Sequence, residues 1–200
     1  MNHTNNNELK VGIYSGSFNP PGIHHRKIVE IALKYVDYLI ISPCGSKHRK
    51  DKIFPKDIFR KEMIQIAFSN LDKIIIDNTS LDNDIFMSNY ELKKKYNSFF
   101  FKKTFHNINF YHIVGSDLTC LYKDDMSVIE LFWENGNDLW SNDNFIVIPR
   151  ENFKINHLPK HTIVLPDTVP GSSTKIKKNI QNSSDLLPEI KQYILEKKLY

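Results

Sequence analysis

The chain has 200 residues, of which 40% are hydrophobic, and this composition favours a folded domain with a sizeable core over a disordered chain. Its formal net charge of +4 suits a protein that handles phosphates but is too small to indicate nucleic-acid binding by itself. The two cysteines, Cys44 and Cys120, are far apart and predict neither a disulfide framework nor a zinc site, so we expect a reducing compartment.

Residues 1–9 are a polar N-terminal tail that lacks the apolar core of a signal peptide. No apolar run in the sequence is long enough to cross a membrane. We therefore expect a cytoplasmic protein whose folded domain covers residues 10–200.

The start of the chain predicts a strand–helix–strand unit. Residues 10–14 are short, apolar and partly β-branched, as in a buried strand, and residues 15–22 are a loop rich in glycine and proline. Residues 23–35 carry apolar side chains at helical spacing, and residues 38–41 are again an apolar strand. This pattern predicts parallel strands joined by a right-handed crossover.

The alternation of strands and helices continues to the end of the chain. We expect further strands over residues 73–77, 109–114, 145–148 and 162–165, and further helices over residues 59–68, 84–96, 127–133, 172–180 and 187–195. Residues 97–107 mix Phe, Lys and Asn without a clear period, and we interpret them as a surface insertion. Repeated βα units predict an α/β fold, with a Rossmann-like open parallel sheet, helices on both faces and a single domain.

The loop after the first predicted strand has features of a ligand-binding loop. In open α/β sheets, ligands lie beyond the carboxyl ends of the strands, where this loop is expected. Gly16 and Gly22 allow backbone to approach a ligand closely, and the following helix offers N–H groups and a positive dipole end to a phosphate. His24 and His25 at the helix start can donate hydrogen bonds to phosphate oxygens. From these residues alone, the loop could equally be a simple connection and the histidines surface residues.

A second candidate loop covers residues 171–177, Gly-Ser-Ser-Thr-Lys-Ile-Lys, which follow a predicted strand and begin a helix. Hydroxyl and backbone N–H groups at a helix start are well placed for phosphate oxygens. Serine and threonine are also ordinary helix caps, and taken alone Ser172, Ser173 and Thr174 fit that interpretation better.

The first loop resembles the opening motif of the nucleotidylyltransferases. Residues 16–21, Gly-Ser-Phe-Asn-Pro-Pro, are similar to that motif, which continues with His-x-Gly-His. In this chain the continuation is Gly-Ile-His-His. His25 therefore keeps the final histidine, whereas Gly22 replaces the first histidine and His24 replaces the glycine.

The second loop resembles the closing motif of the same superfamily, Ile-Ser-Ser-Thr-x-Ile-Arg. The matching residues are Ser172, Ser173, Thr174 and Ile176. Gly171 stands in place of the apolar residue, and Lys177 stands in place of the arginine, which keeps the charge but loses the bidentate fork. Two such motifs at opposite ends of a βα chain are much more specific than either one.

Three further stretches are similar to nicotinate mononucleotide adenylyltransferases of bacterial type. His48-Arg49 follows the second predicted strand, residues 113–117 end a strand with Ile-Val-Gly-Ser-Asp, and Trp133 precedes Pro149-Arg150 at the family's distance. The resemblance associates the carboxylate at the strand end with the ATP ribose, the backbone beside it with adenine, and the tryptophan with stacking on the pyridine ring.

The resemblance implies transfer of AMP from ATP to nicotinate mononucleotide, which forms nicotinate adenine dinucleotide and pyrophosphate in NAD biosynthesis. It implies Mg²⁺ bound with ATP as co-substrate and no metal held by protein ligands. The implied catalytic residues are His25, which acts at the α-phosphate, with His24 and Lys177. The residues implied in ATP binding are Gly16, Ser17, Phe18, Gly115, Asp117, Ser172, Ser173, Thr174 and Ile176, and those implied in mononucleotide binding are Ser17, Phe18, His48, Arg49, Trp133 and Arg150.

Several of these residues also have a purely structural interpretation. Trp133 could belong to the core, and Trp140 is a rival for the pyridine ring. Asp117 could cap a helix, and residues 47–50 could be a solvated basic loop. Nothing in residues 79–90 matches the segment that binds the nicotinate carboxylate in the family. The prediction of nicotinate rather than nicotinamide as substrate therefore rests on overall similarity.

Other functions stay open from the sequence. A phosphopantetheine adenylyltransferase resembles both loops but carries Thr-x-Gly-His and a shorter chain, and residues 169–171 lack the lead-in that a cytidylyltransferase would have. A non-catalytic nucleotide binder would fit the altered histidine motif, and a nucleic-acid binder is the weakest alternative. The expected partners are therefore ATP and nicotinate mononucleotide, with no nucleic acid and no membrane, and a homo-oligomer is left open.

Overall fold

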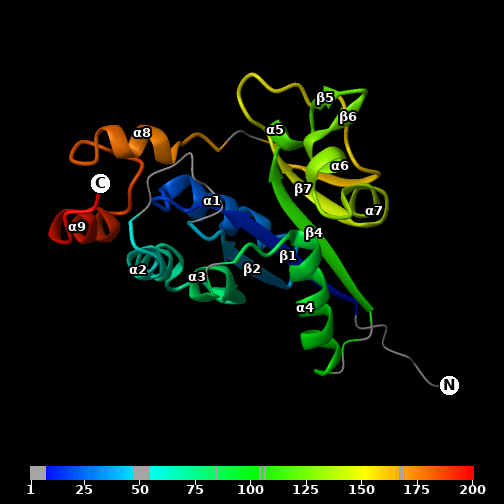
Figure 1. The fold of residues 1–200 in the computed structure, drawn as a ribbon, viewed down its shortest axis with the longest axis horizontal. Helices are drawn as coiled ribbons and strands as arrows, with labels where there is room; N and C mark the ends of the chain where they lie inside the picture. The colour runs from blue at the N-terminus through cyan, green and yellow to red at the C-terminus, as the bar shows by residue number, and fades with distance from the viewer. Residues whose placement is uncertain (1–7, 47–54, 84, 104, 106, 167–168) are drawn as a thin grey trace. The chain divides into compact units, whose positions relative to one another are not determined.

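In the part of the chain that the structure describes, the main sheet has six strands (Figure 1). The computed structural model describes residues 8–46, 55–83, 85–103, 105, 107–166 and 169–200. In spatial order the strands are β3 (Ile74–Ile76), β2 (Tyr38–Pro43), β1 (Glu8–Gly16), β4 (Asn107–Gly115), β7 (Asn144–Ile148) and β8 (His161–Val164). The predicted Rossmann-like α/β fold, with an open parallel sheet in a single domain, is confirmed.

The helices mostly alternate with the strands, as predicted. They are α1 (Ile23–Ala32), α2 (Asp57–Phe68), α3 (Thr79–Asn83), α4 (Asn89–Phe101), α5 (Ser116–Thr119), α6 (Val128–Phe132), α7 (Gly136–Asn142), α8 (Ser173–Lys178) and α9 (Pro188–Glu196). The exceptions to the alternation are that α3 precedes α4 and α6 precedes α7 with no strand between them. A small antiparallel pair, β5 (Leu121–Lys123) and β6 (Met126–Ser127), lies between α5 and α6 in the chain. No helix in the described part of the chain is both long enough and apolar enough to cross a bilayer.

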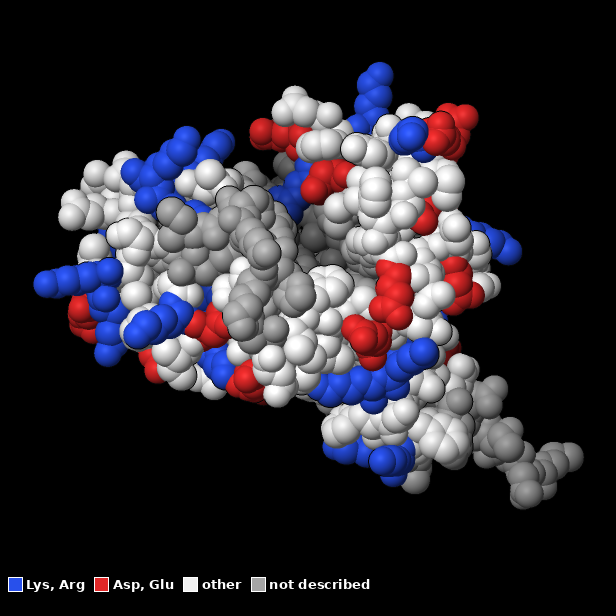
Figure 2. All heavy atoms as spheres, viewed as in Figure 1, with Lys and Arg blue, Asp and Glu red and all other residues white. Residues whose placement is uncertain are grey.

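The single domain consists of two compact units. Unit 1 comprises Met1–Tyr14, Ala32–Leu39 and Ser88–Thr168, and unit 2 comprises Ser15–Ile31, Ile40–Met87 and Val169–Tyr200. On the face drawn in Figure 2, basic and acidic side chains are interspersed on each unit. The expectation that the protein binds no nucleic acid stays a prediction.

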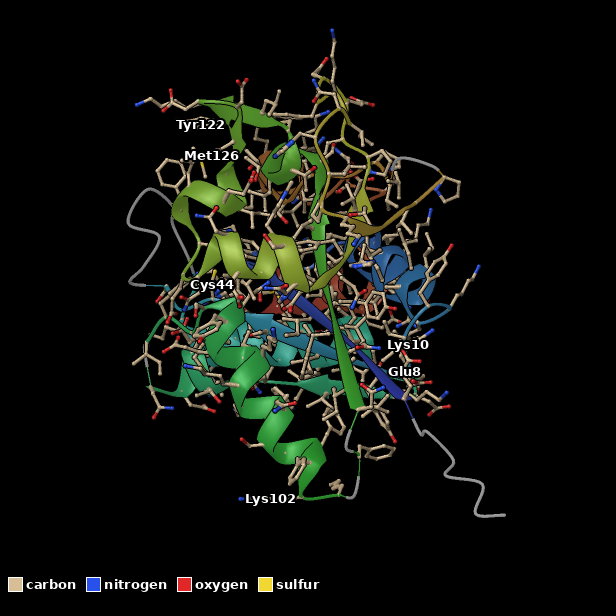
Figure 3. All side chains as sticks on the ribbon, turned by 90° about the vertical axis from the view of Figure 1, so that its right-hand side faces the viewer. Glu8, Lys10, Cys44, Lys102, Tyr122 and Met126 are labelled. Carbon is tan, nitrogen blue, oxygen red and sulfur yellow. The ribbon has the colours of Figure 1, made fainter. Side chains whose placement is uncertain are left out.

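Unit 1 is built on parallel strand pairs. Val11 of β1 lies opposite Phe110 of β4, and Ile113 of β4 lies opposite Ile146 of β7. The buried positions of these strands are mostly apolar, which is typical of strands that are covered on both faces. The buried cluster of this unit contains Val114, Ile129, Trp140, Phe145 and Val147. The β5–β6 hairpin of the same unit carries Tyr122 and Met126, which are labelled in Figure 3, and Tyr122 is largely exposed.

Unit 2 contains both candidate loops and the helices α1, α2, α3, α8 and α9. The buried face of α2 carries Met63, Ile64 and Ala67 at helical spacing, and α2 packs against α9. The hydroxyl of Tyr193 on α9 donates to the carboxylate of Glu62 on α2. Because α9 is tied to α2 in this way, the end of the chain is part of the unit that holds the candidate loops.

The fourth helix differs from its predicted limits of 84–96. It begins at Asn89 because Ser88 and Glu91 form a capping box: the Ser88 hydroxyl accepts from the Glu91 N–H at 3.1 Å, and the Glu91 carboxylate accepts from the Ser88 N–H at 2.8 Å. It ends at Phe101, so residues 97–101 are its last turn, and Phe100 there is buried. The interpretation of residues 97–107 as an insertion stays a prediction.

Among the described residues, three short helices, α3, α5 and α7, have no counterpart among the predicted elements. A Cβ atom on Gly136, the first residue of α7, would lie 2.0 Å from the carbonyl oxygen of Ile129. Such a close approach of two backbone segments requires glycine. It arises from tertiary packing against α6, which no local periodicity in the sequence reports.

Candidate active site

The loop after β1 is anchored in unit 2 by its own aromatic side chain. Phe18 is only 1% exposed, and its ring lies edge-on to Phe68 at 5.9 Å between centroids. The same ring fills the space beside Gly16, where a Cβ atom would lie 3.3 Å from it. Phe18 has φ +44°, a strained conformation for an aromatic residue, and such strain is concentrated at functional loops. The side chain of Phe18, which was predicted to bind nucleotide, is therefore buried and anchors the loop.

A buried arginine that we did not predict as a site residue supports this loop. Arg60 on α2 is fully buried and donates to the carbonyl of Ser17 at 3.0 Å and to the carbonyl of Cys44 at 2.9 Å. Its charge is paired with the carboxylate of Asp57 at 2.7 Å. Cys44, labelled in Figure 3, lies just beyond β2. The guanidinium thus joins the chain segments after β1 and β2. In the sequence, the signal for this buried group was an arginine within the apolar face of a predicted helix.

The segment that follows α9 also contacts the first loop. The hydroxyl of Tyr200 donates to Oδ1 of Asn19 at 2.5 Å, and Asn19 is only 2% exposed. Burial raises the pKa of Tyr200 well above its usual value, against the opposing effect of the Arg60 charge. Nζ of Lys177 lies 5.9 Å from the centre of the Tyr200 ring. The loop is therefore held by side chains from α2 and from the C-terminal segment.

His25 has a defined hydrogen-bonding state in unit 2. The N–H of Gly22 donates to Nδ1 of His25 at 3.0 Å. Since Nδ1 accepts, the neutral ring carries its proton on Nε2, and Nε2–H is the donor that a phosphate oxygen can use. The ring packs against Phe18 at 5.1 Å between centroids. The predicted catalytic histidine is therefore oriented by the loop itself.

The N-terminus of α1 offers fewer backbone donors than we expected. The N–H of Gly22 is used by His25, and the N–H of Ile23 donates to the carbonyl of Asp185 at 2.8 Å. These two groups at the helix start already have protein acceptors. A phosphate at this helix start would therefore need more contacts from side chains than at a bare helix N-terminus.

The last loop lies against the first loop within unit 2. Ser173 Oγ donates to the carbonyl of Pro20 at 2.8 Å, although the two residues are 153 positions apart. The side chain of Ile176 is 1% exposed, and its Cδ1 atom would lie 2.8 Å from a Cβ atom on Gly22. Ile176 is thus a packing residue, and it brings the two motif-bearing loops together.

The hydroxyl residues of the last loop have separate roles. Ser172 Oγ accepts from the N–H of Lys175 at 3.4 Å and is the N-cap of α8, as the structural interpretation predicted. Ser173 holds the first loop, and Thr174 is exposed. Their contacts with phosphate stay predictions.

In unit 1, the structure brings together three of the predicted residues. Oδ1 of Asp117 lies 3.8 Å from Nε of Arg150, and both side chains are partly exposed. A Cβ atom on Gly115 would lie 2.2 Å from this carboxylate and 2.9 Å from the guanidinium. The backbone N–H of Arg150 donates to Ser116 Oγ at 2.8 Å, which fixes the start of the segment after β7. Glycine at position 115 therefore leaves room for an exposed ion pair that a ligand could contact.

The chain from residue 13 to residue 179 matches the family model described as cytidylyltransferase-like. The protein belongs to the cytidylyltransferase-like family. Curated relatives include the probable nicotinate-nucleotide adenylyltransferase of Fusobacterium nucleatum, which is 28% identical over 89% of this chain and 91% of its own. The protein of the same name from Listeria monocytogenes is 27% identical over 96% of this chain and 97% of its own.

Solved structures that are similar to this cytidylyltransferase-like protein include an enzyme with an equivalent name. Plasmodium falciparum nicotinic acid mononucleotide adenylyltransferase, complexed with NaAD, is 27% identical, with a TM-score of 0.68 over 96% of this chain and 97% of its own. A second structure of that protein, complexed with APC, superposes with a TM-score of 0.71 at 24% identity and supports the fold. The predicted resemblance to nicotinate mononucleotide adenylyltransferases is confirmed.

The two tryptophans of the cytidylyltransferase-like domain are buried to different degrees. Trp140 is 8% exposed, belongs to the core cluster of unit 1 and stacks on His157 at 4.8 Å between centroids. Trp133 is only partly buried and lies against that cluster, with its ring edge-on to His112 at 6.2 Å. Of the two rivals for the pyridine ring, Trp133 is thus the more accessible, and its stacking role stays a prediction.

Two predicted substrate-binding residues, His48 and Arg49, lie outside the described residues. Within the part of the chain that the structure describes, no group of three or more His, Cys, Asp or Glu side chains is arranged to hold a metal ion.

Proposed function

We propose that this protein transfers AMP from ATP to nicotinate mononucleotide, forming nicotinate adenine dinucleotide and pyrophosphate in NAD biosynthesis. The observation that carries the proposal is the contact between the two motif loops in unit 2. The hydroxyl of Ser173 in the last loop donates a hydrogen bond to the carbonyl of Pro20 in the first loop, and the same first loop orients the imidazole of His25. The names of the curated relatives, and the NaAD complex of the Plasmodium falciparum enzyme, support this choice among nucleotidyl transfers.

The reaction is a direct in-line displacement. The 5′-phosphate oxygen of the mononucleotide attacks the α-phosphorus of ATP, the bond from that phosphorus to the bridging oxygen breaks, and pyrophosphate leaves with the electron pair. The nucleophile is already an anion, so no general base and no covalent intermediate is needed. Catalysis then consists of aligning two anions and stabilising charge on the transferring phosphoryl group.

The residues of unit 2 are suited to this task. Nε2–H of His25 is proposed to donate to a non-bridging oxygen of the α-phosphate, because Nδ1 is engaged by the loop backbone. His24 and Lys177 are proposed to assist at the phosphates, with Ser172, Ser173 and Thr174. Arg60 keeps the backbone of Ser17 in place without contacting the substrates.

The remaining site residues keep the roles that the resemblance implies. We propose Gly115 and Asp117 for the adenosine part of ATP, and Trp133, Arg150, His48 and Arg49 for the mononucleotide. The half-exposed pair of Asp117 and Arg150 supports these roles, since an exposed ion pair contributes little stability and can exchange its partner for a ligand.

We propose that Mg²⁺ enters with ATP as part of the substrate. Mg²⁺ binds chiefly to phosphate oxygens and water in such sites and needs few protein ligands. When bound, it neutralises charge on the leaving pyrophosphate. A cytoplasmic location, and partners limited to these nucleotides without nucleic acid or membrane, are part of the same proposal, and a homo-oligomer is compatible with it.

The test is pyrophosphate release from Mg-ATP with nicotinate mononucleotide, nicotinamide mononucleotide or phosphopantetheine as acceptor. We expect release with nicotinate mononucleotide and a loss of about 100-fold in kcat for His25→Ala, as for removal of one donor to a transition-state oxyanion. Lys27→Ala, which removes an exposed cation from the same helix, is the matched control.

The other acceptors decide between the alternatives. Release with both pyridine nucleotides keeps the reaction and removes the nicotinate preference, whereas release with phosphopantetheine alone assigns a different substrate. A folded protein that binds ATP but releases no pyrophosphate with any acceptor contradicts the proposal and indicates a nucleotide-binding protein without turnover.

A further inference from the structure

The side chain of Tyr200 contacts both motif loops of unit 2. Its hydroxyl donates to Oδ1 of Asn19 in the first loop at 2.5 Å, although the two residues are 181 positions apart. Nζ of Lys177, at the end of the last loop, lies over the Tyr200 ring at 5.9 Å from its centroid. Figure 1 draws the end of the described chain next to α8 and α9, in agreement with this contact. Tyr200 therefore joins the two segments that carry the proposed chemistry.

The way in which α9 ends determines where Tyr200 lies. The N–H of Lys198 donates to the carbonyl of Leu195 at 3.3 Å, and Lys198 has φ +51°. The N–H of Leu199 donates to the carbonyl of Ile194 at 3.0 Å, which completes a Schellman motif. Leu199 is only 8% exposed, so an apolar side chain also holds the turn in place. The position of Tyr200 is therefore fixed by this turn as well as by its own contacts.

The hydroxyl of Tyr200 bonds to a part of the first loop that α2 also supports. Arg60 on α2 donates to the carbonyl of Ser17, one residue before Phe18. Tyr200 bonds to Asn19, one residue after Phe18. Tyr200 as a whole is 42% exposed, but Asn19 is only 2% exposed, so loss of the hydroxyl leaves a buried acceptor with one hydrogen bond fewer.

The ring of Tyr200 acts on the last loop. Of the three lysines of α8, Lys177 is partly buried, whereas Lys175 and Lys178 are exposed. An aromatic face attracts an ammonium group that lies within about 6 Å of the ring centroid. A lysine side chain has a flexible stem and lacks the planar fork of arginine, so a ring beside it restricts where its charge can lie. This restriction matters most for a cation that has to meet a phosphate.

We propose that Tyr200 is a positioning residue for the transfer reaction. Its hydroxyl holds Asn19 and with it the loop that orients His25, and its ring holds the ammonium group of Lys177. The inference rests on the proposed function, in which His25 and Lys177 contact the phosphates. Tyr200 acts through these neighbours and does not itself touch the substrates.

The first experiment separates the two contacts by steady-state kinetics with Mg-ATP and nicotinate mononucleotide. Tyr200→Phe removes the hydroxyl and keeps the ring, so we expect kcat to fall about fivefold, the size of one hydrogen bond, with the KM for ATP unchanged. Tyr200→Leu removes both, so we expect a similar loss in kcat and a KM for ATP raised about threefold, the size of one exposed cation–π contact.

The matched control is Tyr193→Phe, which removes another tyrosine hydroxyl from the same segment, the one that bonds to Glu62 on α2. We expect it to lower the melting temperature without changing kcat or KM. A merely structural Tyr200 predicts this same pattern for its own variants, and unchanged kcat in Tyr200→Phe therefore overturns the proposal. The phenylalanine variant keeps the size of the side chain, so this comparison holds even if Tyr200→Leu does not fold.

The second experiment tests the contact between the ring and Lys177. In a Lys177→Met background, which keeps the length of the side chain without its charge, Tyr200→Leu should no longer weaken the affinity for Mg-ATP measured by calorimetric titration. An equal loss of affinity in both backgrounds would contradict the role of the ring.

The two experiments distinguish this inference from the proposed function. If the wild-type protein binds Mg-ATP but releases no pyrophosphate with any acceptor, the proposed reaction fails, and the calorimetric comparison still decides whether Tyr200 acts through Lys177. If the wild-type protein turns over and the Tyr200 variants match it in kcat and in KM, the reaction stands and only the role of Tyr200 is wrong. A wild-type protein that does not bind Mg-ATP overturns both.

Discussion

The loops that follow β1 and β4 both begin at a glycine-containing strand end, yet the protein holds them differently. The first is fixed by buried groups: the Phe18 ring, the Arg60 guanidinium and the Asn19 amide. The second is completed by Asp117 and Arg150, which are partly exposed and 3.8 Å apart. The first loop is proposed to bind phosphate, where rigid donors are an advantage because charge that develops in a transition state is best met by groups that need no rearrangement. The partly exposed pair is proposed to move to fit its ligand.

The largest effect is expected at the buried cation of the first loop. Arg60→Met should lower the free energy of unfolding by about 3–5 kcal/mol, since it leaves the Asp57 carboxylate unpaired and two carbonyls without their donor. Urea unfolding measures this loss, and Arg60→Lys should lose less because it keeps the charge. A change below about 1 kcal/mol would mean that the loop does not depend on Arg60.

Gly171 should be the next most sensitive position. Gly171→Ala combines a positive φ with a Cβ atom 2.4 Å from the His24 ring, and we expect a loss of about 3 kcal/mol in the free energy of unfolding. The clash contribution should diminish in a His24→Gly background, whereas the backbone strain should persist. Equal losses in both backgrounds would show that His24 does not pack against this glycine.

A buried network in unit 1 should control stability in acid. Burial opposes ionisation of Asp143, but hydrogen bonds from His112 at 2.8 Å and from Lys93 at 2.5 Å outweigh it and hold its pKa below the ordinary value. A lowered folded-state pKa stabilises the protein above the unfolded pKa of about 3.9, and that stability is lost as the pH falls through the folded pKa.

The lowered pKa of Asp143 predicts how Asp143→Asn changes the dependence of stability on pH. At pH 7 the variant should be less stable by about 2 kcal/mol, and its free energy of unfolding should fall less than that of the wild type between about pH 5 and pH 3. Chemical unfolding at a series of pH values measures both. Parallel curves for the two proteins would exclude Asp143 as a source of acid sensitivity.

The smallest effect on stability is expected at the second strand end. Gly115→Ala places a Cβ atom against Asp117 and Arg150, which are partly exposed and can move aside, so the free energy of unfolding should change by less than about 1 kcal/mol. The KM for ATP should nevertheless rise, because the displaced carboxylate is proposed to contact the ribose. A stability loss as large as that of Gly171→Ala would remove the difference between the two loops.

Much of this protein could be predicted along the chain. Apolar segments identified the strands that the structure describes in the sheet, because the central strands are covered on both faces and need mostly hydrophobic residues. The two motif loops identified the family because each resembles one of its motifs, and the family model matches the chain from residue 13 to residue 179. The limits of α4 were harder to predict from the sequence, because the capping box at Ser88 and Glu91 determines where the helix begins.

What the sequence by itself determined, therefore, is the order of the main strands and helices and the family. The residues proposed to carry the chemistry also come from its motifs, and their roles stay predictions. Only the tertiary structure decided that Arg60 supports Ser17, that Ser173 bonds to Pro20, and that the His24 ring lies where Gly22 and Gly171 leave room. The physical reason is that local patterns report which face of an element is buried, whereas these contacts depend on the close packing of segments that are far apart in the chain.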